Sequence, residues 1–191
     1  TDSPKATHCF SILQAQKNIY GYNFLQEILA KRQDLVEKIF EYCPVTGSGD
    51  GLESVEWVYS NYYLSRQVTA LDRQDILTKM AKEFSTHMYT PEQTRIPGAI
   101  CSGKVDYYNE APFVFQNSKV NLNITLRSIQ TGIPLRAFDI MACGGFLLSN
   151  YQEDFMEFFE PDIDFVMFTS SEEAMDKAAY YVKHDTEGVY T

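Results

Sequence analysis

This 191-residue chain lacks closely spaced cysteines, long hydrophobic runs and clustered basic residues. Its four cysteines lie far apart without a Cys-X-X-Cys pair, so neither metal-ligand nor redox spacing is present. No uninterrupted apolar run approaches the ~18 residues of a membrane-spanning helix, and the N-terminus has no signal-peptide profile. Because nothing marks a secreted or membrane protein, we expect a cytoplasmic one without a membrane span.

The charge distribution excludes some classes of binding partner and indicates one candidate binding site. A net charge of −10 and a pI near 4.7 argue against a nucleic-acid surface or an anionic-membrane surface, since both need clustered Lys and Arg. One interval departs from this acidic background. Residues 119 to 136 contain Lys119, Arg127 and Arg136 and no acidic residue, and this contrast favours an anion site there.

Alternating strand and helix patterns predict an α/β fold, with a Rossmann-like parallel sheet of about four strands flanked by helices. The strands are expected at 86–90, 120–124, 146–149 and 164–168. We expect residues 85–191 to form the Rossmann-like core and residues 1–84 to form a helical N-terminal segment.

The helices and loops of the chain follow from apolar spacing and from Gly and Pro. Residues 1–10 are expected to be a loose leader, and 12–42 to be helical with breaks around Tyr20-Gly21 and Arg32-Gln33. Loops are predicted at 44–51 and 91–103. Further helices are expected at about 52–67, 68–84, 109–117, 153–159 and 171–184, the last capped by Ser171.

The segment from Val120 to Asn150 is the most informative one. It predicts a strand, a polar turn, a short helix opened by Gly132-Ile133-Pro134 and stopped at Gly144-Gly145, and a second strand. Backbone N–H groups at such a helix start favour a phosphate or pyrophosphate. Arg127 and Arg136 flank the turn, and Asp139 lies one helical turn after Arg136. The pattern suits a nucleoside diphosphate, with arginines for the phosphates and an acid for the ribose.

Structural explanations exist for these features. Any α/β domain contains strand, turn, helix and strand, and Pro before a helix with Gly after it is ordinary punctuation. Adjacent tyrosines, among them Tyr107-Tyr108, are expected to pack with one ring inward and one outward. Asp106 and Glu110 are expected to be solvated rather than an acid pair. Tyr89 ends a predicted strand, where ligands of α/β sheets bind, so it could approach a base.

The segment from Ser118 to Tyr151 resembles the signature of the CgeB-like (spore maturation) glycosyltransferases, which have the two-domain GT-B architecture of the group-1 type. The likeness extends upstream through Val105 to Pro112. Downstream it includes Asp154-Phe155, Phe158-Phe159-Glu160 and Tyr180 to His184, and weaker similarity reaches back to Tyr20 to Phe24. It thus covers nearly the whole chain.

The resemblance implies that this is the donor-binding half of an enzyme that transfers a sugar from a nucleotide-diphosphate sugar. Asp139 stands where the family has a ribose-binding glutamate, whereas Thr131 stands where the family often has another acid. It further implies reduced thiols, no metal or separate cofactor, and an N-terminal acceptor-binding domain that this chain does not include, so that the chain alone would be inactive. Donor contacts are expected from Thr125, Gly132, Ile133, Asp139, Gly144 and Tyr89, with Arg127 and Arg136 stabilising the departing diphosphate.

Two other functions stay open at this stage. A degenerate Rossmann-like module that binds a nucleotide or a protein without catalysis would explain the uncharged Thr131. A flavodoxin-like or response-regulator domain would need an early acidic cluster or a phosphate loop, and the sequence has neither.

Overall fold

The computed structural model describes residues 4–45, 53–91 and 95–184, which belong to two compact units. The helical unit comprises residues 1–71 and 126–130, and the α/β unit comprises residues 72–125 and 131–191. Most of the predicted loop at 44–51 and part of that at 91–103 lie outside the described residues. The boundary expected after residue 84 stays a prediction.

The helical unit buries an aliphatic core. It contains α1 (Pro4–Lys17), α2 (Leu25–Lys31), α3 (Gln33–Tyr42), α4 (Val55–Val58), η1 (Tyr59–Leu64) and the first residues of α5 (Ser65–Glu83). Leu29, Leu35 and Tyr59 are buried together, and the Tyr59 hydroxyl donates to the carbonyl of Cys43 at 2.8 Å. The predicted breaks near residues 20 and 32 are confirmed, since α2 lies between them.

Residues 4–10 do not form the loose leader that the sequence suggested, and residues 1–3 lie outside the described residues. Helix α1 starts at Pro4, and proline suits the first helical position because its missing N–H would have no partner there. The expected separate helices at 52–67 and 68–84 are also wrong. Helical structure runs without interruption from Val55 to Glu83, through the π-helical segment η1. No Gly or Pro stands in that stretch to break it.

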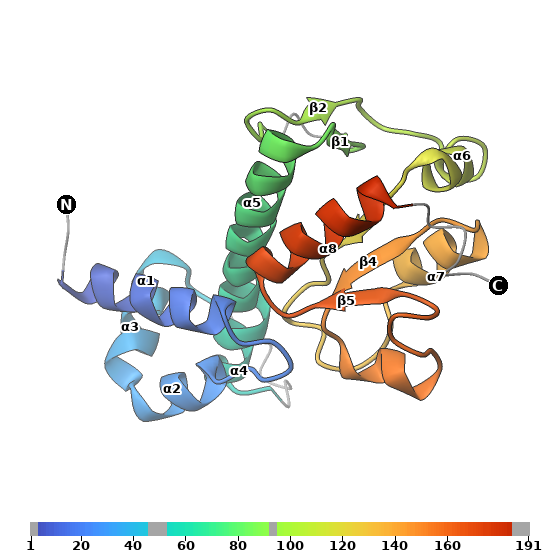
Figure 1. The fold of residues 1–191 in the computed structure, drawn as a ribbon. Helices are drawn as coiled ribbons and strands as arrows, with labels where there is room; N and C mark the ends of the chain where they lie inside the picture. The colour runs from blue at the N-terminus through green and yellow to red at the C-terminus, as the bar shows by residue number, and fades with distance from the viewer. Residues whose placement is uncertain (1–3, 46–52, 92–94, 185–191) are drawn as a thin grey trace. The chain divides into compact units, whose positions relative to one another are not determined.

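The α/β unit is built on three parallel strands (Figure 1). β3 (Asn121–Asn123), β4 (Leu147–Asn150) and β5 (Val166–Phe168) pair in the order β3-β4-β5. Helix α6 (Ala111–Asn117) precedes β3 and has Pro112 in its first turn, as predicted. α7 (Leu135–Ala142) connects β3 to β4, the 3-10 helix η2 (Glu153–Glu157) connects β4 to β5, and α8 (Ser171–Lys183) follows β5.

Strand β4 is the centre of this unit, and all four of its residues are buried. Leu147 packs with Ala137 and Ile140 of α7 and with Phe155 and Phe165. Successive side chains of a strand point to opposite faces, so Leu148 faces the side on which α8 lies in Figure 1. A central strand that is covered on both faces is expected in a parallel sheet. The predicted α/β fold class with a parallel sheet flanked by helices is therefore confirmed.

Two details differ from the sequence-based expectation. The strand predicted at 86–90 is the short β1 (His87–Met88), and it pairs in parallel with β2 (Ile100–Cys101) in a separate two-stranded sheet. β2 lies in the stretch predicted to be a loop. The cap of α8 is Ser170 rather than Ser171, because the Ser170 side chain accepts the N–H of Glu173 at 3.1 Å.

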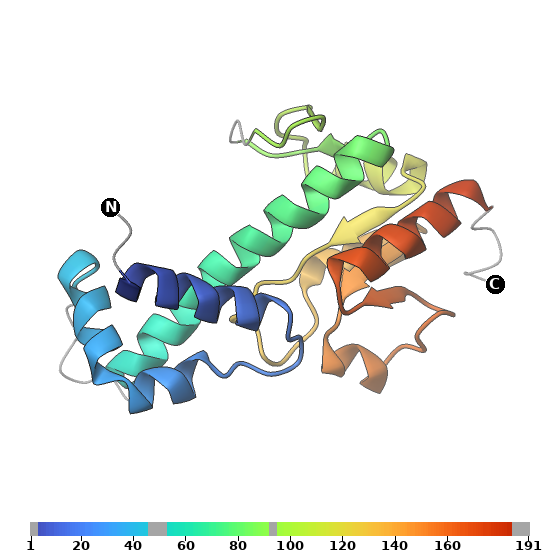
Figure 2. The same cartoon turned by 60° about the vertical axis from the view of Figure 1, so that its left-hand side comes forward.

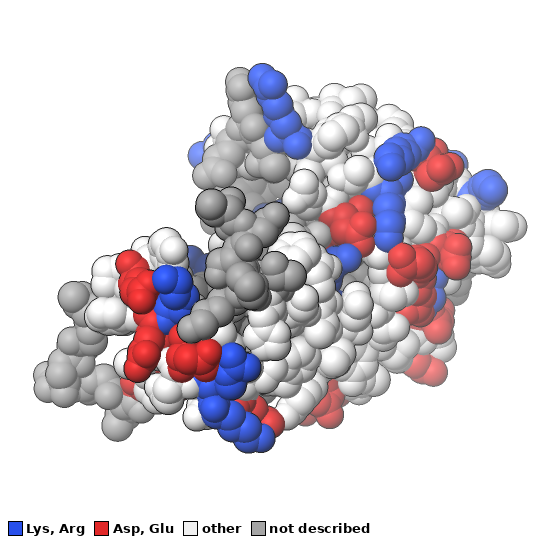
Figure 3. Space-filling model, turned by 90° about the vertical axis from the view of Figure 1, so that its left-hand side faces the viewer, with Lys and Arg blue, Asp and Glu red and all other residues white. Residues whose placement is uncertain are grey.

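Acidic and basic side chains are interspersed on the face of the molecule shown in Figure 3, between broad uncharged areas. The described residues on that face form no continuous basic surface of the kind that nucleic-acid binding needs.

Candidate functional site

The carboxyl ends of β3 and β4 carry a buried network of uncharged polar side chains. The Asn123 amide donates to Thr125 Oγ1 at 3.1 Å and to Ser149 Oγ at 2.9 Å. The backbone N–H of Thr125 donates to Asn150 Oδ1 at 2.7 Å. Satisfied buried networks of this kind are rigid, and the carboxyl ends of parallel strands are where α/β sheets bind ligands. The network therefore gives Thr125, a predicted site residue, a fixed position.

Three members of this network were not identified from the sequence. Asn123, Ser149 and Asn150 are all buried polar residues on or beside predicted strands. The alternating Asn121 and Asn123 in an otherwise apolar strand were the available signal, because buried amides need partners. Asn121 uses its amide differently, donating to the carbonyl of Phe115 at 2.9 Å and so holding α6.

The turn before α7 adopts the conformation that its glycine allows. Gly132 has a φ of 94°, and a Cβ placed there would meet no atom within 4 Å, so the space beside it is open. Its N–H is not free, since it donates to the Asp154 carboxylate. Its carbonyl accepts from the Gln152 amide at 3.3 Å. The N–H group that was predicted to bind a phosphate therefore donates to a carboxylate in this structure.

The start of α7 offers further N–H groups. Its N-cap residue is Pro134, which makes no side-chain cap, so the first N–H groups of the helix have no side-chain partner from that position. Ile133 is half-buried against the core of the unit, and Thr131 is exposed. Of the two predicted turn residues, Gly132 is exposed with its N–H bonded to Asp154, and Ile133 packs against the core.

Asp139 lies in a polar cluster on α7. Its Oδ2 is 4.0 Å from Nε of Arg136, one turn earlier on the same face as expected. The Tyr107 hydroxyl forms a hydrogen bond with Asp139, and this bond raises the pKa of Tyr107 above its ordinary value. Arg136 is 58% exposed and Asp139 27% exposed, so a ligand can reach both. The guanidinium of Arg136 also lies 5.8 Å from the ring centre of Phe115.

Tyr107 was missed because adjacent tyrosines were expected to send one ring inward. Both rings are exposed instead, 48% for Tyr107 and 82% for Tyr108, and they contact each other edge to face at 5.1 Å. The reason is that Asp106 and Glu110 form a local turn. Asp106 accepts the N–H of Tyr108 at 3.1 Å, and Glu110 accepts the N–H of Asp106 at 2.7 Å. The two acids are exposed, as predicted.

Arg127 belongs to the helical unit, whereas Arg136 belongs to the α/β unit. The Arg127 guanidinium donates to the carbonyl of Lys17 at 2.8 Å and to that of Ile19 at 3.0 Å. It also lies 3.4 Å from the ring centre of Tyr20. Cations favour the carboxyl end of a helix, so Arg127 holds the end of α1 in this structure.

The remaining predicted residues have local roles. Tyr89 follows β1 in the two-stranded sheet and stacks on His87, with ring centres 6.5 Å apart. Gly144, with a φ of 72°, donates its N–H to the carbonyl of Met141 at 2.9 Å and ends α7. A Cβ on Gly145 would come within 2.7 Å of the Phe115 carbonyl, so that position needs glycine.

Two further observations concern the described part of the chain as a whole. No group of three or more His, Cys, Asp and Glu side chains is arranged there to hold a metal ion. None of its helices combines the length and the apolar character that crossing a membrane requires.

Comparison with known proteins connects this geometry to a family. A family model described as glycosyl transferase-like matches residues 66–188, more than half of the chain. A search of curated proteins and a search of solved structures each found no match. The match includes the whole polar network, the Gly132 turn and the Asp139 cluster.

Proposed function

Because the chain belongs to the glycosyl transferase-like family, we propose that its α/β unit binds a nucleotide-diphosphate sugar as the donor for sugar transfer. Within that family we assign it to the CgeB-like subgroup of GT-B type, on the motif between Ser118 and Tyr151. The acceptor-binding part would belong to another domain. A cytoplasmic location and a hexosyl donor are parts of the same proposal.

The Asp139 cluster carries this proposal. Asp139 supplies the carboxylate that two ribose hydroxyls can donate to, and Tyr107 fixes its orientation through their hydrogen bond. Arg136 lies beside it with an exposed guanidinium suited to phosphate. Because α7 follows β3, its N-terminal turn with Gly132 lies toward the carboxyl ends of the strands. One helix thus offers groups for both the ribose and the diphosphate.

Transfer needs stabilisation of the negative charge that builds up on the departing diphosphate. Arg136 and the N–H groups at the start of α7 are the donors available in this unit. Preorganised donors of this kind stabilise a transition state by several kcal/mol when water is excluded. The acceptor hydroxyl attacks the anomeric carbon, the bond to the diphosphate breaks, and the hydroxyl proton goes to a base outside the described residues.

A nucleotide screen tests donor binding directly. Calorimetric titration with UDP-, GDP- and dTDP-sugars should show binding of one of them. Asp139→Asn should weaken binding of that nucleotide by roughly ten- to a hundredfold, because hydrogen bonds to a charged group contribute about 1.5–3 kcal/mol. The same substitution should barely change the affinity for the 2′,3′-dideoxy analogue. Equal weakening of both ligands would contradict the ribose role of Asp139.

A non-catalytic nucleotide-binding module is the second candidate, and two observations favour it. Thr131 is exposed and uncharged where the resembling family often has an acid, and the Asp154 carboxylate already holds the N–H of Gly132. Hydrolysis or transfer of the sugar, measured in the presence of the acceptor-binding domain proposed above, decides between the candidates. Binding without any sugar release would favour the module.

A further inference from the structure

Arg73 is a cation at the end of β3 that the residue pattern along the chain does not indicate. It lies on the part of α5 that belongs to the α/β unit and runs beside β3 (Figure 2). Its terminal nitrogen donates to the carbonyl of Ile124 at 2.8 Å. Ile124 is the first residue after β3, and Thr125 of the buried polar network follows it. The guanidinium is therefore fixed at the carboxyl end of the sheet.

The charge of this guanidinium is not matched by an acid. The Arg73 residue is exposed, although burial of the part beside the end of β3 lowers its pKa, and no carboxylate among the described residues forms an ion pair with it. An arginine keeps its charge at neutral pH in spite of such a shift. Because the guanidinium is exposed and has no acidic partner among the described residues, an anion from solvent can reach it and accept charge-assisted hydrogen bonds. The site therefore favours an anionic ligand.

The other arginines with described contacts are engaged differently. Arg32 pairs with Asp34 at 2.7 Å, and Arg136 lies 4.0 Å from Asp139. Arg127 donates to main-chain carbonyls of the helical unit. Arg73 is bound to one neutral carbonyl, which leaves most of its five N–H donors for a ligand. That single bond also orients the planar group in advance, so less conformational entropy is lost on binding.

We infer that Arg73 is a phosphate-binding residue, and that it contacts the diphosphate of a ligand bound at the carboxyl ends of β3 and β4. The inference rests on the donor-binding function proposed above. It assigns to Arg73 the role that the sequence pattern gave to Arg127, because Arg73, unlike Arg127, belongs to the same unit as the polar network.

The test compares two substitutions of Arg73 with a matched control. Arg73→Gln removes the charge, Arg73→Lys keeps a charge without the planar fork, and Arg66→Gln removes an exposed guanidinium from the same helix. Inorganic pyrophosphate and UDP are titrated against each variant, and melting temperatures are recorded. We expect Arg73→Gln to weaken both ligands by roughly ten- to a hundredfold. Arg73→Lys should recover a large part of the loss, and Arg66→Gln should bind like the unmodified protein.

Each contrary outcome has a definite meaning. Arg73→Gln binding as tightly as the unmodified protein overturns the inference, as does absence of pyrophosphate binding in the unmodified protein. If Arg73→Lys is as weak as Arg73→Gln and both melt early, Arg73 only anchors α5 to β3. If UDP binds Arg73→Gln as tightly as the unmodified protein, the inference about Arg73 is wrong, whereas the proposed donor function remains supported. Arg73-dependent pyrophosphate binding without preference for UDP, GDP or dTDP supports the anion site and contradicts the nucleotide donor.

Discussion

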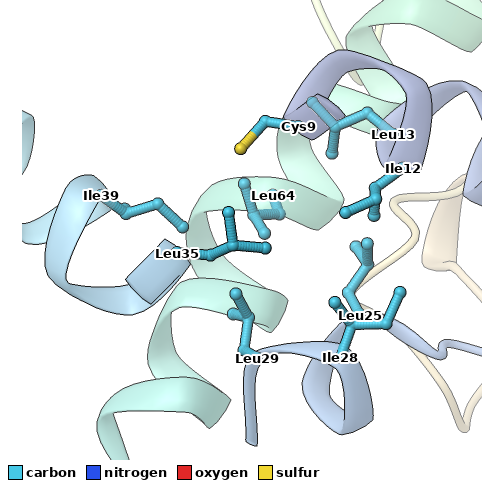
Figure 4. Close-up of a pocket in the computed structure, with 9 residues that line it drawn as sticks. All are labelled: Cys9, Ile12, Leu13, Leu25, Ile28, Leu29, Leu35, Ile39 and Leu64. Carbon is cyan, nitrogen blue, oxygen red and sulfur yellow. The ribbon is translucent and has the colours of Figure 1, made fainter. Parts of the chain in front are cut away.

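The helical unit and the α/β unit achieve stability by different means. The core of the helical unit borders a partly open cavity of about 60 Å³, lined by the aliphatic side chains and thiol drawn in Figure 4. The core of the α/β unit is aromatic and close-packed. Phe155 and Phe165 stack at 4.6 Å, and the chain approaches itself so tightly at Gly145 that no Cβ fits. Polar groups of the site require fixed positions, and the close-packed unit is the one that holds them.

Truncation of an aromatic residue in the α/β unit should have the largest effect. Phe165 is fully buried and contacts Phe155 and Phe159, so Phe165→Ala should cost about 3–5 kcal/mol of unfolding free energy. Leu35→Ala in the helical unit should cost only about 2 kcal/mol, because Leu35 already borders a cavity. Urea unfolding followed by circular dichroism measures the first. Fluorescence of the single tryptophan, Trp57, measures the second. Equal costs would remove the contrast between the two cores.

Replacement of Arg127 separates its structural role from its predicted catalytic role. Arg127→Ala loses two hydrogen bonds to the end of α1 and the contact with Tyr20. The helical unit should be destabilised by about 1–3 kcal/mol, visible as an earlier transition of Trp57 fluorescence. Nucleotide affinity of the folded protein should stay unchanged. A loss of nucleotide binding at temperatures where the variant is fully folded would support the phosphate role that the sequence suggested.

Filling the cavity should have the smallest effect, and a favourable one. The side chain of Cys9 lines the cavity together with Ile39 and Leu64 (Figure 4). Burial raises the pKa of the Cys9 thiol. Cys9→Leu adds apolar volume there and should stabilise the unit by about 0.5–1 kcal/mol. Cys43→Leu is the control, since Cys43 is exposed and adds nothing to the core. A destabilised Cys9→Leu variant would show that the cavity does not accept another side chain.

Local chemistry accounts for what the sequence could predict. The bounds of α7 follow from Pro134 before it and Gly144 after it, and β3, β4 and β5 follow from short apolar runs between turns. The π-helical segment η1 could not be predicted, because no residue type in that stretch specifically favours a π-helix over an α-helix.

The site itself depends on contacts between distant segments. Arg73 and Ile124 are 51 residues apart, and Tyr107 and Asp139 lie on different elements. Such pairings follow from how the strands and helices pack, and a residue pattern along the chain does not contain them. The shared face of Arg136 and Asp139 was predictable because helical spacing alone sets it.

The Asp154 carboxylate, which accepts the N–H of Gly132, competes with any phosphate for that N–H group. Any phosphate that binds the N–H of Gly132 has to expel a carboxylate of the same sign, which then returns to water. The measured affinity for the phosphate ligand is then the intrinsic affinity multiplied by a fraction. That fraction is the share of molecules in which the hydrogen bond between Gly132 and Asp154 is broken before the ligand binds. If that fraction were about one in a hundred, a donor would bind about a hundredfold more weakly than its contacts alone would allow.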